Sequence, residues 1–344
     1  MPRPMHNFIR HGYLSVDPFF VLSGFVMALT YGAAFAGEFS GEAYGGFLYK
    51  RLGRVYPLYL IASLVMLVLL LAGIVPGSHP SGATLAFNVF LAQAWGFADS
   101  IDSPGWSIST EFGAYLLFPV LVTFLLRGRL TRALLGIAAA LATLAFIAAR
   151  SIDQLHQATG GAHRSGPLDV FGAGTPYPLL RCVAGFALGL AAFRLAGLPS
   201  VRRAMGNRFI GDAIAATIIW ALLVRGVDLL IVPLFTALVI ALPSEASATA
   251  KFLGSKSVYF LGLISYSLYL VHVPLKALLK VPLKILLDHM HVPFAQSVSG
   301  CLLLIPCVAL AAITYYSIEK PARNWSRQIA GLRRPRLVAE LSSP

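Results

Sequence analysis

Long apolar runs separated by short polar connections dominate this chain. A helix needs about 20 apolar residues to cross the roughly 30 Å hydrocarbon layer of a bilayer. Nine runs reach or approach that length, at 18–36, 55–75, 106–126, 133–149, 179–195, 209–224, 227–243, 258–279 and 299–318. A further apolar stretch, 84–97, is too short to cross and is expected to be re-entrant or interfacial. The pattern predicts an all-α polytopic membrane protein with about nine transmembrane helices.

Composition and charge support this fold class and set the orientation. The chain of 344 residues is 57% hydrophobic and 12% charged, with mean hydropathy +0.75, which excludes a soluble domain of this length. With the stretch before Asp17 outside, the inside loops and the C-terminal tail hold 18 of the 27 Lys and Arg residues. This excess is typical of cytoplasmic segments. We therefore expect a C-terminus in the cytoplasm and contact with membrane lipids, and we attribute the net charge of +13 to topology rather than to nucleic acid.

The predicted helices belong to one domain, residues 1–325, and residues 326–344 form a basic cytoplasmic tail that we expect to be disordered. Nine crossings with a cytoplasmic C-terminus place the N-terminus outside, yet MPRPMHNFIRHG has no apolar region of a secretory signal. This mismatch predicts a further helix before the first run. The three cysteines have no metal-site spacing and no zinc or nucleotide motif is present, so we expect no metal.

Two arginines lie together at a membrane boundary, in KRLGRVYPLYL. Arg51 and Arg54 stand at i and i+3 and therefore share one face of a helix, near its N-terminal end. Their side chains could anchor the helix by snorkelling. They could equally bind phosphate groups by paired, charge-assisted hydrogen bonds. The pair is a candidate anion site.

Three ionisable residues within or beside the apolar runs are candidate catalytic groups, because such residues are costly in a membrane. Asp17 precedes Pro18 at a helix start, where it could cap the helix. Glu111 lies about one turn inside the run that starts near Trp106, with Ser107 and Tyr115 at i−4 and i+4. It could be a helix-start acid favoured by the helix dipole, or it could orient or accept a proton.

His272 is the third of these residues. It shares one polar stripe with Ser265 and Tyr269, and a packing role for it is as reasonable as a catalytic one. Near the cytoplasmic end of the last run, Glu319 and Arg323 stand at i and i+4 and predict an ion pair.

Four sequence blocks, taken together and in order, resemble the acyltransferase 3 family of integral-membrane O-acyltransferases. They are GYLSVDPFFVLSGFV, KRLGRVYPLYL, SPGWSISTEFGAYLLFP, and SYSLYLVHVPL followed by YYSIEKPARNW. The resemblance covers nearly the whole chain. It implies ten spans, a place in the bacterial inner membrane, and transfer of an acyl group, commonly acetyl from acetyl-CoA, to a hydroxyl of a glycan or lipid-linked sugar. Acyl-CoA would be a donor substrate, with no permanently bound cofactor.

The resemblance also implies roles for residues. The family's first helix carries an arginine and, about ten residues later, a histidine thought to act in acyl transfer. His6 best fits that histidine and His11 is the runner-up, although the arginine would precede Met1. Asp17 recurs beside the reaction chamber, and Arg51 and Arg54 would bind the phosphates of CoA.

The sequence therefore predicts a membrane O-acyltransferase whose reaction chamber runs through the membrane. Two other functions stay open. A transporter or flippase of a sugar or lipid intermediate would explain Glu111 and His272, but not an arginine pair suited to phosphate. A truncated, inactive relative is the third possibility.

Overall fold

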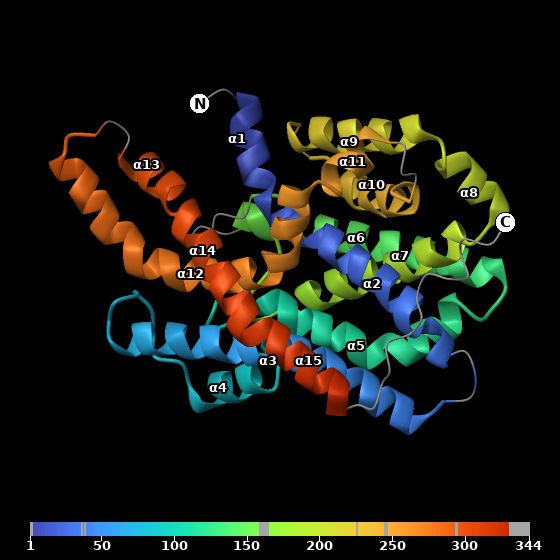
Figure 1. The fold of residues 1–344 in the computed structure, drawn as a ribbon, viewed down its shortest axis with the longest axis horizontal. Coiled ribbons are helices and arrows are strands. Elements are labelled where there is room, and N and C mark those ends of the chain that lie inside the picture. Colours follow the sequence, from blue (N-terminus) through green and yellow to red (C-terminus); the bar gives the residue numbers. More distant parts are fainter. Residues whose placement is uncertain are drawn as a thin grey trace. The chain divides into compact units, whose positions relative to one another are not determined.

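The structure is a computed structural model that describes residues 3–35, 37, 39–157, 165–224, 226–243, 247–292 and 295–329. These residues form helices and connecting loops, without a strand among them (Figure 1). The described part of the chain is therefore all-α, as predicted. It divides into two compact units, which we describe separately: a first unit of residues 1–40 and 80–262, and a second unit of residues 41–79 and 263–344.

The first unit contains most of the helices. In chain order they are α1 (Arg3–Arg10), η1 (His11–Val16), α2 (Asp17–Tyr31), η2 (Gly32–Phe35), α4 (Gly82–Val89), η3 (Gln93–Trp95), α5 (Gly105–Leu125), α6 (Leu130–Gln157), α7 (Tyr177–Ala196), α8 (Pro199–Met205), α9 (Arg208–Leu222), α10 (Asp228–Ala241) and α11 (Ala248–Leu253). The second unit contains α3 (Gly41–Leu71), all but the start of α12 (Lys256–His289), α13 (Ala295–Leu302), α14 (Leu304–Thr314), η4 (Tyr315–Glu319) and α15 (Lys320–Ile329).

Seven helical segments of the described residues are long and apolar enough to cross a membrane. They are Met5–Phe35, Gly41–Leu71, Gly105–Leu125, Leu130–Ser151, Tyr177–Ala196, Lys256–His289 and Val298–Ile329. The described residues therefore contain seven candidate transmembrane helices, where about nine were expected. The difference arises because α9 and α10 have only 15 and 14 residues, fewer than the roughly 20 that a crossing needs. The stretch 84–97 forms the short α4 and η3, neither of which could cross.

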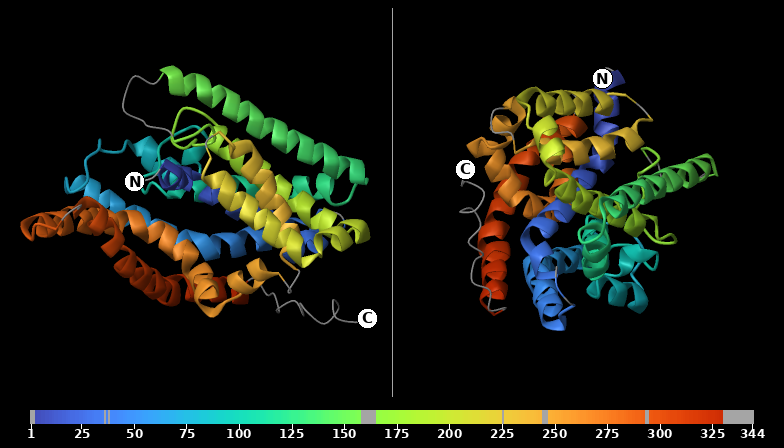
Figure 2. Two further views of the ribbon diagram at one scale, coloured as in Figure 1. Left: turned by 90° about the horizontal axis from the view of Figure 1, so that it is seen from above. Right: turned by 90° about the vertical axis from the view of Figure 1, so that its right-hand side faces the viewer.

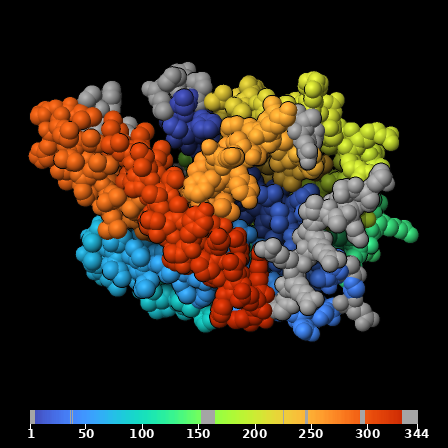
Figure 3. Space-filling model, in the orientation of Figure 1, coloured from blue at the N-terminus to red at the C-terminus, as the bar shows by residue number. Residues whose placement is uncertain are grey.

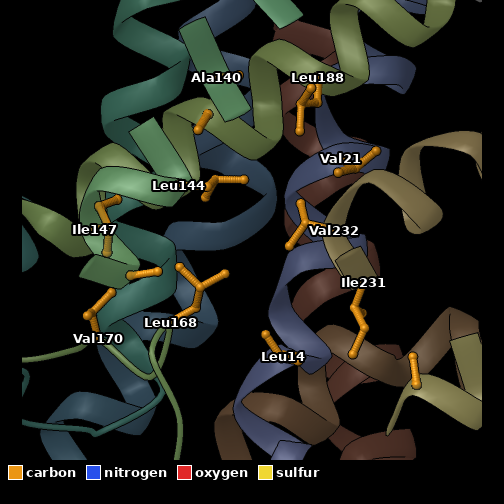
Figure 4. Packing of buried hydrophobic residues seen from close by; sticks show 13 residues of the cluster. Leu14, Val21, Ala140, Leu144, Ile147, Leu168, Val170, Leu188, Ile231 and Val232 are labelled. Carbon is orange, nitrogen blue, oxygen red and sulfur yellow. The ribbon is translucent and has the colours of Figure 1, made fainter. Parts of the chain in front are cut away.

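Two glycines let α2 and α7 pack with their backbones in close approach. A Cβ on Gly24 would lie 2.0 Å from the carbonyl oxygen of Phe186, and a Cβ on Gly189 would lie 1.9 Å from that of Val21. Small residues permit this approach between helices in a membrane. The buried hydrophobic cluster of the first unit forms around this crossing, and Val21, Leu144, Leu188 and Ile231 bring α2, α6, α7 and α10 into it (Figure 4). The long α6 packs along α7 (Figure 2).

Helices α2, α5 and α7 run in the same direction. Along α2, successive residues meet successive residues of α5: Phe20 contacts Trp106 and Ser23 bonds to Glu111. The same order holds with α7, where Asp17 binds Arg181 two turns before Gly24 meets Phe186. Parallel neighbours place the starts of all three helices at one end of the first unit, and this end carries the candidate site.

In the second unit, α3 packs against α15. A Cβ on Gly53 would lie 2.3 Å from the Cβ of Ser326, which is buried. Helix α15 continues to Ile329, four residues past the predicted domain boundary at Trp325. The rest of the predicted tail, residues 330–344, lies outside the described residues.

Candidate functional site

Glu111 lies on the second turn of α5, as predicted, and two hydroxyl groups hold its carboxylate. Ser23 Oγ of α2 and Tyr115 Oη of α5 both donate to Glu111 Oε1, at 2.6 and 2.5 Å. The side chain is half-buried. Hydrogen bonds to an ionised acceptor are short and strong, so this arrangement stabilises the carboxylate form and fixes its direction. Among the residues that the structure describes, both of these hydrogen bonds go to Oε1, so Oε2 is the oxygen available for a substrate or a proton.

Of the two predicted neighbours of Glu111, Tyr115 forms a hydrogen bond with its carboxylate. The hydroxyl of Ser107 donates to the carbonyl of Pro104 at 3.2 Å. Ser23 was not predicted, because it is 88 residues away in the chain. The one feature of the sequence that pointed to Ser23 is its place in VLSGF, within one of the four blocks that resemble the family.

Asp17 forms a buried ion pair with Arg181 of α7. Arg181 Nε donates to Asp17 Oδ1 at 3.0 Å and Arg181 Nη2 to Oδ2 at 2.6 Å, and each residue is at most 1% exposed. The expected capping role of Asp17 is wrong, because η1 leads directly into α2 and Val16 occupies the cap position. The carboxylate instead joins α2 to α7. Arg181 lies within the second turn of α7.

Aromatic rings and a carbonyl complete the surroundings of Arg181. Its guanidinium carbon lies 5.9 Å from the ring centre of Tyr13 and 5.8 Å from that of Trp106. Its Nη2 also donates to the carbonyl of Tyr13 at 2.8 Å. Cation–π contacts of this kind stabilise a desolvated cation. Three elements, η1, α5 and α7, are thereby joined through one side chain.

A second buried acid, Asp228 at the start of α10, extends this network. Its Oδ2 accepts hydrogen bonds from Tyr13 Oη at 2.5 Å and from the backbone N–H of Leu168 at 3.2 Å. Its Oδ1 lies 3.9 Å from Nε2 of His11. His11 Nδ1 lies 2.9 Å from the carbonyl of Leu222, which can only accept, so Nδ1 carries a proton. His11 is thus a buried member of the network rather than a loop residue. Neither Tyr13 nor Asp228 was predicted as a site residue.

The other candidate bases are His6 of the first unit and His272 of the second unit. His6 is on α1 with an exposed side chain. His272 is half-buried in α12, and its Nδ1 lies 2.7 Å from the carbonyl of Tyr269, so that nitrogen carries a proton and Nε2 is the possible base.

The second unit contains both arginines of the candidate anion site. Arg51 is 9% exposed, whereas the side chain of Arg54 is 43% exposed. The two arginines share one helix face. The expectation that free N–H groups at the helix N-terminus would add to anion binding is wrong, because α3 begins at Gly41, almost three turns before Arg51. Its free N–H groups are therefore distant from both guanidiniums.

Glu319 is the buried acid beside Arg54. Its Oε1 lies 4.0 Å from Arg54 Nε, and its Oε2 accepts a hydrogen bond from Ser267 Oγ at 2.8 Å. The expected ion pair with Arg323 is wrong, since Arg323 Nη2 donates to Tyr315 Oη at 3.2 Å. Glu319, the last residue of the π-helical turn η4, is instead held by Ser267 and lies near Arg54.

Among the described residues, His, Cys, Asp and Glu side chains do not gather in groups of three or more that could hold a metal ion. Each unit therefore carries its own candidate group of residues: the first unit holds the hydroxyl-held Glu111 and the Asp17–Arg181 pair, and the second unit holds the Arg51 and Arg54 face. Such groups suit proton transfer and anion binding respectively.

Comparison with known proteins is consistent with groups suited to proton transfer and anion binding. The family described as an acyltransferase domain, acyltransferase 3, matches residues 3–316. The chain is similar to "Acyltransferase MdmB" of Streptomyces mycarofaciens, with 32% identity over 40% of this chain and 36% of that protein. It is also similar to "Protein 2 in picA locus" of Rhizobium radiobacter, with 47% identity over 16% of this chain and 27% of that protein. The chain thus spans about a third of the length of these curated relatives.

No solved structure matches the chain. The family match, however, covers the first three sequence blocks and SYSLYLVHVPL, reaches the first two residues of YYSIEKPARNW, and includes every candidate site residue except Glu319 and Arg323. The chain belongs to the acyltransferase 3 family of membrane acyltransferases.

Proposed function

We propose that the protein is an O-acyltransferase of the bacterial inner membrane that transfers an acyl group, acetyl, from acyl-CoA to a hydroxyl of a cell-surface glycan or lipid-linked sugar. Family membership over residues 3–316 supports acyl transfer. The observation that carries the proposal is the carboxylate of Glu111, which two hydroxyls hold in one direction with Oε2 left available.

In this reaction the acceptor hydroxyl oxygen attacks the thioester carbonyl, the C–S bond breaks, and CoA leaves as a thiolate. The proton of the hydroxyl passes to a base and finally to the thiolate. We assign Glu111 to this proton transfer, either as the base through Oε2 or as the group that orients a histidine base. His6 is the proposed histidine, by resemblance to the family, and His272 is the second candidate.

Asp17 is proposed as a positioning residue. Both of its oxygens already accept hydrogen bonds from Arg181, so it has little capacity to accept a proton from a substrate. Its ion pair fixes the start of α2, from which Ser23 reaches Glu111. Removing it would therefore disturb the site without removing a reacting group.

Arg51 and Arg54 are proposed to bind the phosphates of acyl-CoA. Arg54 is the more exposed and would make the direct contacts, while Arg51 lies one turn earlier on the same helix face. Guanidinium groups bind phosphate by paired hydrogen bonds. A cytoplasmic C-terminus and a cytoplasmic donor side follow from the charge distribution, and reporter fusions at the C-terminus would test that orientation.

The proposal is tested with purified protein in nanodiscs, [¹⁴C]acetyl-CoA, and lipid-linked sugars and surface glycans extracted from the source cells. An enzyme releases CoA and labels the acceptor, and Glu111→Gln does not. A transporter moves a sugar or lipid intermediate across proteoliposomes without releasing CoA. An inactive relative does neither, and either of these last results would overturn the proposal.

A further inference from the structure

Helix α12 is longer than a membrane crossing requires. Its 34 residues extend about 50 Å at 1.5 Å per residue, against a hydrocarbon layer of roughly 30 Å. Residues 257–275 contain no Lys, Arg, Asp or Glu and are long enough to cross by themselves. Lys276 is the first charged residue after them, so it marks the boundary, and residues 276–289 continue the helix beyond it.

This extension of α12, residues 276–289, has two different faces. Lys276, Lys280 and Lys284 follow one another at i, i+4 and i+8 and form a basic row. Large apolar side chains cover the other side, as an apolar arc of Leu278, Leu279, Val281, Ile285 and Leu286, with exposed fractions from 38% to 62%. In Figure 3 this end of α12, drawn in orange at the left, presents its surface outward.

The apolar arc would be costly in water. Each large apolar side chain gains stability when it leaves water, and soluble surfaces rarely carry a contiguous apolar patch of this kind. A straight continuation of the helix away from the membrane would leave the whole arc hydrated. Pro274 and Pro282 lie within the helix, one just before the boundary and one in the extension, and each removes a backbone hydrogen bond. The helix can therefore bend where it leaves the hydrocarbon layer.

We propose that residues 276–289 lie along the membrane surface as a docking helix for anionic phospholipids. The apolar arc enters the boundary between head groups and acyl chains, and the basic row meets the head-group phosphates. Asp288 accepts a hydrogen bond from Lys284 and offsets one charge, so that Lys276 and Lys280 supply most of the attraction. Each lysine near an anionic surface adds to this attraction.

Lipid fits this surface better than a second copy of the chain. Two copies that met through the apolar arc in a two-fold arrangement would bring two basic rows toward each other. A membrane surface offers the opposite charge and an apolar layer at the depth where the arc lies. The proposal does not depend on the proposed acyl transfer.

The test is a depth measurement on the full chain in nanodiscs. A spin label replaces Ile285, in a background with Cys182, Cys301 and Cys307 changed to Ser, and its collisions with oxygen and with a water-soluble nickel chelate are compared. We expect oxygen collisions to dominate by several-fold, and the label to move deeper when phosphatidylglycerol is added to phosphatidylcholine. A label at Lys284 of the same background should show the opposite preference.

Three variants complete the test. The change of Lys276, Lys280 and Lys284 to Gln should remove the response to phosphatidylglycerol, while their change to Arg should retain it. Changing the exposed Arg129, Arg202 and Arg203 to Gln removes three charges elsewhere and should leave the response intact. A label at position 285 that collides mainly with nickel, an unchanged response in the Gln variant, or spin–spin broadening between two copies would overturn the proposal.

Discussion

The guanidinium of Arg181 binds both carboxylate oxygens of Asp17, at 3.0 and 2.6 Å, in a place where neither residue reaches solvent. The pair lies two turns before the glycine contact of α2 with α7, so the same two helices are joined by a charge pair at one point and by backbone packing at the next. Together they fix the position of Ser23, which lies between these contacts in the sequence and bonds to Glu111.

Breaking this ion pair should be more harmful than replacing it. Arg181→Met leaves the Asp17 carboxylate buried without its partner, and we expect a loss of about 3–5 kcal/mol in unfolding free energy. Asp17→Leu combined with Arg181→Met should recover most of this loss, because an apolar pair needs no desolvation of charge. Unfolding of the purified variants in detergent measures both. A double variant that folds but transfers no acyl group would assign Asp17 a chemical role beyond positioning.

Glu111→Gln should abolish acyl transfer while the protein stays folded, because Gln keeps the shape and loses the charge. Ser23→Ala removes one of the two hydroxyls on Oε1, which is worth about 1.5–3 kcal/mol for a charged acceptor, or roughly a 10- to 100-fold lower rate. Ser107→Ala is the matched control on α5, since its hydroxyl bonds to Pro104 instead. Equal rates for the Ser23 and Ser107 variants would contradict the role of the hydroxyl pair.

Arg54→Ala should weaken binding of acyl-CoA by about 1.5–3 kcal/mol, the scale of hydrogen bonds to a charged group. Arg54→Lys should recover part of the affinity, because an ammonium lacks the planar fork of the guanidinium. Arg51→Ala should weaken binding and also lower stability, since Arg51 is only 9% exposed. Calorimetry with a non-transferable acyl-CoA analogue measures the dissociation constant, with Lys50→Ala, a change at the half-buried lysine next to Arg51, as control. An unchanged constant for the Arg54 variant would leave the pair as membrane anchors.

The sequence predicted those parts of the molecule that depend on local spacing. Apolar runs located the helices, and the i, i+4 relation of Glu111 to Tyr115 located one of its two hydroxyl partners. It also placed Arg51 and Arg54 on one helix face. Helix length was less accessible, because an apolar run shows where lipid contact begins and not where the backbone becomes helical. Helix α3 accordingly starts 14 residues before the predicted run.

The rest of the site depends on contacts between distant segments, which spacing does not reveal. Asp17 and Arg181 are 164 residues apart, and Tyr13 and Asp228 are 215 apart. A single sequence offers no sign that these side chains meet. An arginine in an apolar run was the available clue, since such a residue needs a buried partner.

The close approach of α2 and α7 predicts different results for two glycine substitutions. Gly189→Ala places a Cβ 1.9 Å from the carbonyl oxygen of Val21, so the helices must separate, at a cost of about 1–3 kcal/mol or more. Gly262→Ala in α12 meets nothing within 4 Å and should be neutral or stabilising by about 0.5–1 kcal/mol, because alanine favours the helix. Thermal unfolding of both variants measures the difference. A Gly189 variant as stable as the wild type would show that the crossing is looser than this contact implies.

The burial of Asp102, in the loop before α5, leads to a prediction of how the stability of the protein depends on pH. The residue is 1% exposed, and neither carboxylate oxygen has a hydrogen-bond partner among the described residues. Burial raises the pKa of this carboxyl from its ordinary 3.8 to about 7. Between these two values the folded protein binds the proton and the unfolded chain does not. The contribution of Asp102 to stability therefore falls as pH rises from about 4 to about 7, and then stays constant.

Asp102→Asn should remove this pH dependence. At alkaline pH the variant no longer has a buried, unpaired charge, so it should be more stable than the wild type by up to about 4 kcal/mol, the equivalent of three pKa units. At the acidic end of the range, where the wild-type carboxyl is protonated, the two should be similar. Asp99→Asn is the control, because Asp99 is exposed and accepts a hydrogen bond from the backbone of Ala173, and it should leave the slope in place. Melting temperatures measured across this pH range decide the matter: a wild-type slope retained by Asp102→Asn would mean that the slope comes from another group and that the pKa of Asp102 is not raised in the folded protein.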